Sequence, residues 1–401
     1  ASCVTGLVVV NTGTAWSTFG QIVILVLIQA GGLGIMTIST LLLLMAGRRP
    51  SLADRVVIQD TYTRSGERSL LSILRDVILF TFVIEGVGTV ALFCRFFPGK
   101  SIGEALYLSV FHSISAFCNA GFSLFAKSFV DYRKDWFLNM VLCILIIGGG
   151  IGFLVLSELR REFPFNRRRW SRLSLHTKMS LLTTIGLLLS STFIILMMEW
   201  HNTLAEFTPY NRMIMAFFQA VTTRTAGFNT LTIGNLTNAT LFIFILLMFI
   251  GACPGSCGGG IKTTTFACLT VLGVSRLRGQ QRPQVFHRTI SDASMGKAVN
   301  LVMFSVVVIV LGTTGLLLSE LGGMPHYLSR GRFLEILFEV VSAVGTVGLS
   351  TGFTDALSLA GKLIIATVMF VGRFGPLVVV AAISNRGPKS YHYAEENIII
   401  G

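Results

Sequence analysis

Charged side chains are scarce in this sequence. Asp, Glu, Lys and Arg make up 13% of its 401 residues, against about 25% in a typical soluble domain. None of them occurs between Ala1 and Gly47, and an apolar run of that length exceeds the ~20 residues that a bilayer-spanning helix needs. The shortage of charge excludes a soluble enzyme.

Paired cysteines and clustered catalytic residues are also missing. The cysteines number seven and are scattered through apolar segments, which excludes a secreted disulfide scaffold. No group of His, Asp and Glu residues gathers at one depth, so a membrane enzyme is not indicated either. Cys253 and Cys257 are four residues apart without a His or acidic neighbour, which disfavours a metal site. The net charge of +13 indicates cytoplasmic loops rather than nucleic-acid binding.

What the sequence has instead is a series of apolar stretches long enough to cross a membrane. We predict seven spans, at residues 19–46, 77–97, 136–158, 179–199, 240–273 (interrupted), 298–319 and 359–384. Shorter apolar stretches lie between some of them, at 102–117, 210–223 and 332–344. Each has only about 13 to 16 residues, too few to cross a bilayer, and is expected to form a half-helix that enters the membrane without spanning it.

The basic residues orient these spans. The linkers 48–75, 160–178 and 276–297 and the tail after residue 385 hold 20 Lys and Arg residues, whereas the opposite side holds ten, Arg224 among them. Cytoplasmic loops carry the excess of Lys and Arg. We therefore place the linkers and the C-terminus in the cytoplasm, with the half-helices opening to the outside.

A repeated unit runs through the chain. The four copies of its central segment each end in glycine and comprise Val4-Thr5-Gly6, Asn119-Ala120-Gly121, Thr225-Ala226-Gly227 and Thr346-Val347-Gly348. A half-helix precedes the last three, and an apolar span with glycines near its middle follows each. The first copy lacks its opening span and half-helix, so we expect about 50 or more residues to precede Ala1, as the repeat length implies.

The repeat predicts an all-α polytopic membrane protein with four span, half-helix, loop and span units around one central pore. Its units are residues 1–47, truncated at the start, 48–159, 160–275 with the interrupted second span, and 276–401 with a cytoplasmic tail. Extended backbone at membrane depth is tolerated only where it lines a polar path. Four such loops provide rings of carbonyl oxygens that replace the hydration shell of a cation, and glycine permits the necessary backbone angles. Close packing of the spans is the alternative reason for the mid-span glycines.

These motifs resemble the Trk/Ktr/HKT superfamily of potassium transporters, most closely the bacterial Ktr-type pore subunit, over essentially the whole chain. The motifs that carry the resemblance are His112 to Ser123, Thr223 to Asn229, and Gly258 to Thr264. The resemblance implies K⁺ uptake through a selectivity filter formed by the four segments, a homodimer, and a cytosolic RCK-type ring of nucleotide-binding subunits (ATP/ADP or NAD) in a bacterial cell membrane. It implies no cofactor, with K⁺ as the transported ion and Na⁺ as a candidate coupling or activating ion. A serine at the first filter glycine accompanies sodium selectivity in plant relatives, so Gly6 favours K⁺.

The interrupted span is predicted to hold an intramembrane gate, because its glycines and proline cannot sustain a helix. By resemblance, the gate residues are Gly251, Pro254, Gly255, Ser256, Gly258, Gly259, Gly260, Lys262 and the pore-facing Arg373. A kink without a gating role is the alternative for the loop, and a structural arginine is the alternative for Arg373. A phosphate-binding Walker loop is not indicated, because Ile261 separates Gly260 from Lys262.

Two questions stay open in the sequence. Glu85 lies within a predicted span, where it either packs against Ser or Thr partners or takes part in ion coupling. The carbonyl rings serve a channel and a coupled transporter equally, so a Na⁺- or H⁺-coupled K⁺ symporter, or a mainly Na⁺-conducting relative, is the alternative function.

Overall fold

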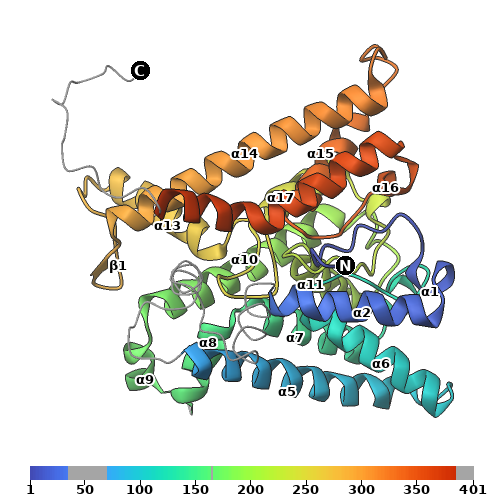
Figure 1. Cartoon of the computed structure of the whole chain (residues 1–401), viewed down its shortest axis with the longest axis horizontal. Coiled ribbons are helices and arrows are strands. Elements are labelled where there is room, and N and C mark those ends of the chain that lie inside the picture. The colour runs from blue at the N-terminus through green and yellow to red at the C-terminus, as the bar shows by residue number, and fades with distance from the viewer. Residues whose placement is uncertain (35–69, 164–165, 385–401) are drawn as a thin grey trace, which may run out of the picture.

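A computed structural model describes residues 1–34, 70–163 and 166–384, and this part of the chain is dominated by helices (Figure 1). The elements are α1 (Thr12–Ala15), α2 (Thr18–Leu33), α5 (Leu70–Phe96), α6 (Ile102–Phe117), η1 (Val130–Tyr132), α7 (Trp136–Gly150), α8 (Phe153–Arg161), α9 (Arg167–Arg172), α10 (Leu175–Glu199), α11 (Pro209–Thr222), η2 (Ile233–Asn235), α12 (Asn238–Phe249), α13 (Thr263–Leu277), β1 (Gln284–Val285), β2 (Arg288–Thr289), α14 (Asp292–Leu321), α15 (Arg332–Val344), α16 (Phe353–Ala356) and α17 (Leu359–Ser384). The two strands pair as a short antiparallel hairpin.

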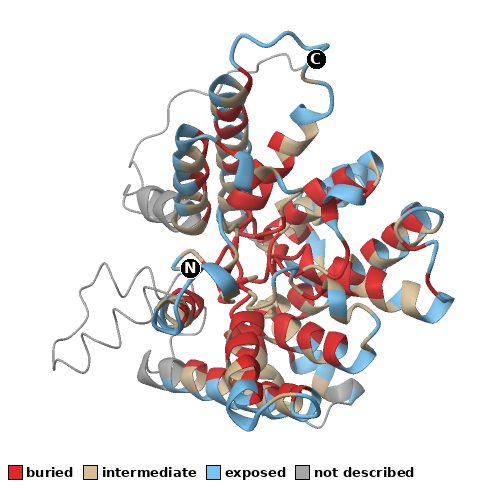
Figure 2. Cartoon of the chain, turned by 90° about the vertical axis from the view of Figure 1, so that its right-hand side faces the viewer, coloured by how far each residue is buried: buried red, intermediate tan, exposed pale blue. Residues whose placement is uncertain are grey.

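Buried residues gather toward the middle of the molecule, and exposed residues lie around its rim (Figure 2). Many of the exposed side chains on the long helices are large and apolar, such as Phe82 on α5, Phe193 on α10 and Leu311 on α14. An apolar exterior of this kind suits helices that face lipid rather than water.

Short polar side chains set where the helices begin. The hydroxyls of Ser101, Ser174, Thr237 and Ser291 and the carboxylate of Asp135 each accept the backbone N–H of the residue three positions further on. Such caps satisfy one of the free N–H groups at a helix start. They also fix the points at which the apolar runs begin.

The three predicted half-helices are confirmed as helices. They correspond to α6, α11 and α15, whose bounds match the predicted ranges to within one residue. The predicted interruption of the span 240–273 is also confirmed, since α12 ends at Phe249 and α13 starts at Thr263.

The predicted spans are confirmed in part. In the described residues, three helices are long and apolar enough to cross a membrane, namely Arg75–Phe96, Leu175–Glu199 and Asp292–Leu321, and a bent pair makes up to four. The last predicted span coincides with α17. Residues 35–46 of the first predicted span, residues 48–69 of the first linker and the tail 385–401 lie outside the described residues.

The prediction of one continuous span at 136–158 is wrong. The chain bends by 98° between α7 and α8. Gly152, with a φ of +95°, makes the turn. The bend leaves carbonyls free at the end of α7, and the carbonyls of Gly149 and Gly150 accept N–H groups from Cys257 (3.1 Å) and Cys253 (3.0 Å). A distant loop thus occupies the place where the helix would have continued.

The ends of neighbouring helices are joined by buried or half-buried carboxylates. Glu199, at the end of α10, accepts the backbone N–H of Thr237 at the start of α12 (2.9 Å). Glu320, near the end of α14, accepts that of Ser358 before α17 (3.1 Å). Asp135 caps α7 itself and pairs with an arginine of α5. The same junction is therefore stabilised in three copies of the repeat, although the charges are arranged differently.

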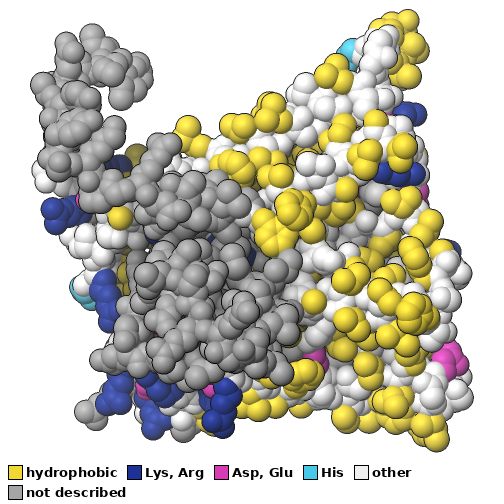
Figure 3. All heavy atoms as spheres, viewed as in Figure 1, with side chains coloured by type: hydrophobic (Ala, Val, Ile, Leu, Met, Phe, Trp, Pro, Cys, Tyr) yellow, Lys and Arg dark blue, Asp and Glu magenta, His cyan; other side chains and the backbone are white. Residues whose placement is uncertain are grey.

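Basic side chains gather at one end of the molecule. Figure 3 shows Lys and Arg concentrated at the left, near α8, α9 and α13, while hydrophobic side chains cover much of the remaining visible face. This end carries the described parts of the linkers 160–178 and 276–297. The two linkers therefore share one side, as the charge count predicts.

Candidate functional site

The four glycine segments, which lie more than 100 residues apart in sequence, meet in a closed ring. A Cβ built on Gly6 would lie 3.1 Å from the Cα of Gly121, and one on Gly121 would lie 3.0 Å from that of Gly227. The corresponding distances are 3.3 Å from Gly227 to Gly348 and 3.2 Å from Gly348 back to Gly6. The structure thus brings all twelve predicted filter residues together, in the order of the repeats.

The backbone of each segment follows the same alternating course. The first residue has a positive φ of 53°, 57°, 69° and 49° at Val4, Asn119, Thr225 and Thr346. The glycine that ends each segment also has a positive φ, between 71° and 93°, whereas the middle residue does not. When left-handed and right-handed backbone conformations alternate along a segment, successive carbonyl groups turn toward the same side. A left-handed conformation costs a non-glycine residue roughly 1–2 kcal/mol, so four matched cases indicate a functional geometry.

The half-helices end directly at these segments. The N–H of Ala120 bonds to Ser115 O, and that of Val347 bonds to Ser342 O, both at 2.8 Å. Each half-helix therefore points its partially negative C-terminal end at the ring, which favours cations there.

A second set of anchors fixes the chain beyond each of the last three glycines. His112 Nε2 accepts the N–H of Leu124 (3.2 Å) and Glu339 Oε1 accepts that of Thr351 (3.1 Å). With its amide oxygen facing them, Gln219 accepts the N–H groups of Thr230 (3.3 Å) and Leu231 (3.1 Å). Leu124, Thr230 and Thr351 each lie three residues after a segment glycine. Sequence reasoning assigned these anchors no role, since a histidine, a glutamine and a glutamate share no motif.

The loop 251–262 lies against the ring. A Cβ on Gly258 would clash with Thr225 Oγ1, and one on Gly259 would clash with Thr346 Oγ1. Only glycine permits so close an approach of the loop backbone. Within the described part of the chain, the buried hydroxyl of Thr346 has no hydrogen-bond partner. The predicted gate loop therefore lies in direct contact with two of the four segments.

The two ends of the loop are closed against each other, and its tip is tied to α8. The N–H of Gly251 bonds to Ile261 O (2.8 Å). The carbonyl of Gly255 accepts the N–H of Phe153 (2.9 Å) at the start of α8. Ser256 Oγ donates to Cys253 O (2.6 Å) within the loop. Pro254 faces the same junction, since a Cβ on Gly152 would lie against its carbonyl.

Two cationic side chains hold the carbonyls of the loop. Lys262 Nζ donates to Gly258 O (2.7 Å). Arg373, on α17, donates from Nη1 to Cys257 O (2.6 Å) and from Nη2 to Gly31 O on α2 (2.5 Å). The structure therefore places Arg373 beside the loop, where it bridges the loop to α2.

Glu85 lies in the interior, 4% exposed. Its carboxylate accepts from Gln29 Nε2 (3.2 Å), and Cys118 Sγ lies 3.8 Å away. The expected hydroxyl partner is present at the backbone only, where Ser113 Oγ donates to Glu85 O (2.7 Å). The side chain thus links α5, α2 and the end of α6.

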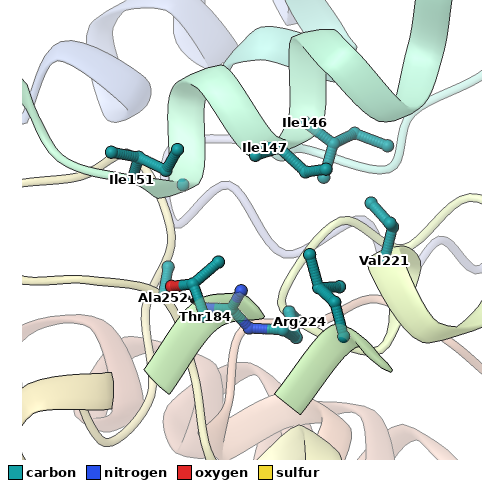
Figure 4. A pocket seen from close by; sticks show the side chains of 9 residues that line it. Ile146, Ile147, Ile151, Thr184, Val221, Arg224 and Ala252 are labelled. Atoms are coloured by element: carbon teal, nitrogen blue, oxygen red, sulfur yellow. Dashed lines mark hydrogen bonds between the residues drawn. The ribbon is translucent and has the colours of Figure 1, made fainter. Parts of the chain in front are cut away.

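The assignment of Arg224 to the outer side is wrong. This residue is 8% exposed and lines a small hollow of about 10 Å³ between α7, α10, α11 and the loop. Figure 4 shows Arg224 beside Thr184 and Ala252, opposite Ile146, Ile147 and Ile151. Counting charges by segment could not detect this, because the burial of Arg224 depends on contacts with α10 and the loop.

These apolar helices and the oxygen-lined ring are those of a multi-pass membrane protein. The family model described as TrkH, cation transport protein, matches residues 1–393. The chain therefore belongs to the TrkH family of cation transport proteins.

Curated relatives match along the whole chain. The Ktr system potassium uptake protein B of Bacillus subtilis is 37% identical over 403 residues, which cover 100% of this chain and 87% of the relative. The potassium/sodium uptake protein NtpJ of Enterococcus hirae is 34% identical and is covered to 88%. Among solved structures, the potassium transporter TrkH from Vibrio parahaemolyticus has the same fold, with a TM-score of 0.68, 17% identity, and coverage of 96% of this chain and 76% of that one.

Proposed function

We propose that this chain is the pore-forming subunit of a bacterial K⁺ uptake system, with the glycine ring as its selectivity filter. The observation that carries the proposal is the closed ring itself, in which four segments share one alternation of backbone handedness. Carbonyls turned to a common axis replace the hydration shell of a cation. The hydroxyls of Thr225 and Thr346, which lie between the ring and the loop, add oxygen ligands at its inner end.

Potassium is the ion that the site and the relatives favour. Glycine occupies the last position of all four segments, including Gly6, so every copy can adopt the same backbone. Two curated relatives are named as potassium uptake proteins of a Ktr system. The name of NtpJ includes sodium as well, and for this reason a Na⁺-conducting or ion-coupled protein is the second candidate.

The arrangement around the pore follows the repeat. Residues 1–47, 48–159, 160–275 and 276–401 form the four units, each contributing one segment to the ring. The basic end that carries α9 and α13 faces the cytoplasm, because Lys and Arg are concentrated in cytoplasmic loops. The half-helices then open to the outside.

The loop 251–262 is the gate of this pore. It contacts two filter segments. Its hydrogen-bond partners outside the loop include Arg373, the end of α7, the start of α8, Thr184 on α10 and Thr263, while Lys262 Nζ bonds back to Gly258 O within the loop. A flexible element with few stabilising contacts is where switching is usually placed. Arg373 adds a fixed positive charge below the filter, which opposes a resident cation.

A second copy of the chain and a cytosolic ring of RCK-type nucleotide-binding subunits complete the system. The relatives named protein B of a Ktr system point to further components. The basic linker 160–178 is the surface for an acidic regulator, and anionic lipid is its competitor. If Arg167 and Arg168 are replaced by glutamine, co-purification of the regulator at moderate salt should weaken, and unchanged co-purification would assign the linker to lipid.

Uptake of radioactive rubidium tests the proposal directly. Expression in cells deficient in K⁺ uptake should restore rubidium entry, and K⁺ should compete with it better than Na⁺. Dependence of entry on external Na⁺ would favour the coupled or Na⁺-activated alternative. Absence of rubidium entry in cells that carry the protein and its regulator in the membrane would refute a K⁺ pore.

A further inference from the structure

Arg224 directly precedes the third filter segment, and it is charged, unlike the residues before the other three segments. The corresponding residues before Val4, Asn119 and Thr346 are Cys3, Cys118 and Gly345. Arg224 is 8% exposed. The three ion pairs found among the described residues join Arg95 to Asp135, Lys100 to Glu104 and Arg161 to Glu162. Arg224 therefore introduces one buried cation beside one filter segment in four, without a carboxylate from the described part of the chain.

The guanidinium lies in a polar cluster that connects the filter to the loop. Arg224 Nη2 donates to Thr184 Oγ1 on α10 (3.3 Å). The Thr184 hydroxyl lies 3.4 Å from Cys253 Sγ, and Thr263 Oγ1 donates to the same sulfur (3.1 Å). We call these four residues, Arg224, Thr184, Cys253 and Thr263, the Arg224 cluster. It joins the third filter segment, α10, the part of the loop around Cys253 and the start of α13.

Stability alone does not account for this arrangement. Burying a cation costs several kcal/mol unless its partners compensate, and in the described structure Arg224 Nε has no hydrogen-bond partner. The hollow beside it is lined by Ile146, Leu188 and Val221, so an apolar side chain would pack there. Replacing a buried charge by an apolar residue is often neutral or stabilising. The charge is therefore better explained by what it connects.

The part of the loop around Gly259 and Gly260 has a different environment. The hollow beside Gly260 is lined by Phe304, Ser305, Val308, Val344, Val371 and Gly372, none of which is charged. Gly259 approaches Thr346 of the fourth segment, but Gly345, directly before that segment, has no side chain with which to reach the loop. Near Cys253 the loop thus has a polar side-chain connection to the residue before a filter segment, whereas no such side chain lies before the segment that Gly259 approaches.

We propose that Arg224 is a positioning residue that couples the loop to the third filter segment. The inference rests on the proposed gating role of the loop. While the loop is closed, Cys253 and Thr184 hold the guanidinium and, through it, the left-handed backbone of Thr225. When the loop leaves, the cluster loses Cys253, and Thr225 is no longer held from below. The affinity of the filter for K⁺ thus depends on the position of the gate.

A comparison of two backgrounds tests this coupling. Arg224→Met should shift the K⁺ concentration for half-maximal flux by about 3- to 10-fold in the intact protein, which lies in the range that substitutions between two coupled sites produce. In a variant lacking residues 253–259 the same substitution should shift it less than about twofold, because the partner Cys253 is gone. The measurement is K⁺ flux into liposomes at varied K⁺, with maximal rate and half-maximal concentration analysed separately.

Cys253→Ala and Thr184→Val give an independent route that leaves Arg224 in place. Each should shift the half-maximal concentration in the same direction as Arg224→Met, and Arg224→Met with Cys253→Ala should shift it no further than the larger single effect. Thr192→Val is the matched control on α10, because its hydroxyl bonds to Leu188 O of its own helix (2.7 Å), and it should leave flux unchanged.

The outcomes separate this inference from the gating proposal. Equal shifts with and without the loop, or additive effects of Arg224→Met and Cys253→Ala, would overturn the coupling. Unchanged half-maximal K⁺ concentrations in folded Cys253→Ala and Thr184→Val variants would also overturn the coupling. These two variants provide the test if Arg224→Met does not fold. If deletion of the loop fails to raise flux, the gate assignment is wrong. The comparison of Arg224→Met, Cys253→Ala and the double variant uses the intact chain and does not depend on that result.

Discussion

The glycine ring and the loop 251–262 are both rich in glycine and lie against each other, but they are held in different ways. Each of the last three ring segments continues from the C-terminal end of a half-helix and is anchored again three residues after its glycine, by His112, Gln219 or Glu339. The loop is held from outside mainly through carbonyl and N–H groups that meet Arg373, α7 and α8.

The difference fits the two roles that we propose, selection for the ring and switching for the loop. A filter must keep its oxygens in place while ions pass, so it is fixed on both sides by buried hydrogen bonds. A gate needs two arrangements whose free energies differ by only a few kcal/mol. With a net contribution of about 1 kcal/mol per hydrogen bond, the contacts that hold the loop are of that order. The same residue type therefore serves rigidity in one region and release in the other.

Removing the loop is expected to have the largest effect. Deletion of residues 253–259 should raise K⁺ flux about tenfold or more without the regulator, since loss of about 1.4 kcal/mol of barrier corresponds to one factor of ten. The measurement is flux per purified protein in liposomes. Thr270→Val, which removes only a hydroxyl bonded to Phe266 O of its own helix (3.0 Å), is the control and should leave flux unchanged. Flux at or below the unmodified level in a monodisperse deletion variant would leave the loop as a kink.

Perturbing the ring should change selectivity rather than gating. Gly6→Ser introduces a Cβ at a φ of +82°, where it would clash with Ala120 O of the neighbouring segment. We expect K⁺ over Na⁺ discrimination to fall about tenfold, because selectivity depends on the number and field of the carbonyl oxygens. Competition of Na⁺ with rubidium uptake measures it. Gly103→Ser, at a position with open space around it, should behave like the unmodified protein, and unchanged selectivity in Gly6→Ser would exclude Gly6 from the filter.

Releasing a single cation from the loop should have a smaller effect. Arg373→Ala removes the bonds to Cys257 O and Gly31 O, and flux should rise about threefold because both a fixed charge and a loop contact are lost. Arg373→Lys keeps the charge but not the forked geometry. Its flux should lie between that of Arg373→Ala and that of the unmodified protein. Arg212→Ala is the control, since that guanidinium bonds to carbonyls at Phe207 and Ala205. Aggregation of Arg373→Ala, or normal expression with unchanged kinetics, would argue against the gating role.

The smallest effect on transport is expected at the anchors of the ring. Glu339→Leu removes the acceptor of the Thr351 N–H and of three hydroxyls, from Ser350, Thr351 and Thr354, and should destabilise the protein by about 1–3 kcal/mol. Glu339→Gln keeps an acceptor and should lower the unfolding temperature less, with flux within about twofold of the original. Thermal unfolding in detergent measures both, with the less buried Glu335→Gln as control. If Glu339→Leu melts like the original protein, the anchor is dispensable.

The features that were predictable from sequence depend on short stretches of chain. Half-helices were predicted because an apolar stretch such as 332–344 is too short to cross a bilayer. The interruption after Phe249 was predicted because glycine and proline exclude a helix whatever their surroundings. The matching of four glycine segments likewise needed only their spacing.

The features that were missed depend on contacts between distant residues. The bend at Gly152 is stabilised by N–H groups of the loop, about 100 residues further along the chain, and a glycine within an apolar run does not show which partner will meet it. Arg224 was placed outside because it follows a half-helix, and its burial is apparent only from Thr184 and Cys253. The anchors were missed because three different side chains perform one task, and a repeat search compares identities rather than acceptor positions.

The contacts of the loop also have a consequence for biosynthesis. The acceptors on α7 precede the loop in the chain, but Arg373, which donates to Cys257 O, is added 116 residues after that cysteine. At roughly 5–20 residues per second, the ribosome needs about 6 to 23 seconds to supply this arginine after the loop is made. During that interval the loop has only its contacts with elements made earlier, such as α7, α8 and α10, and the fourth segment of the ring is still being completed. A chain released before α17 would therefore carry the loop without its arginine contact.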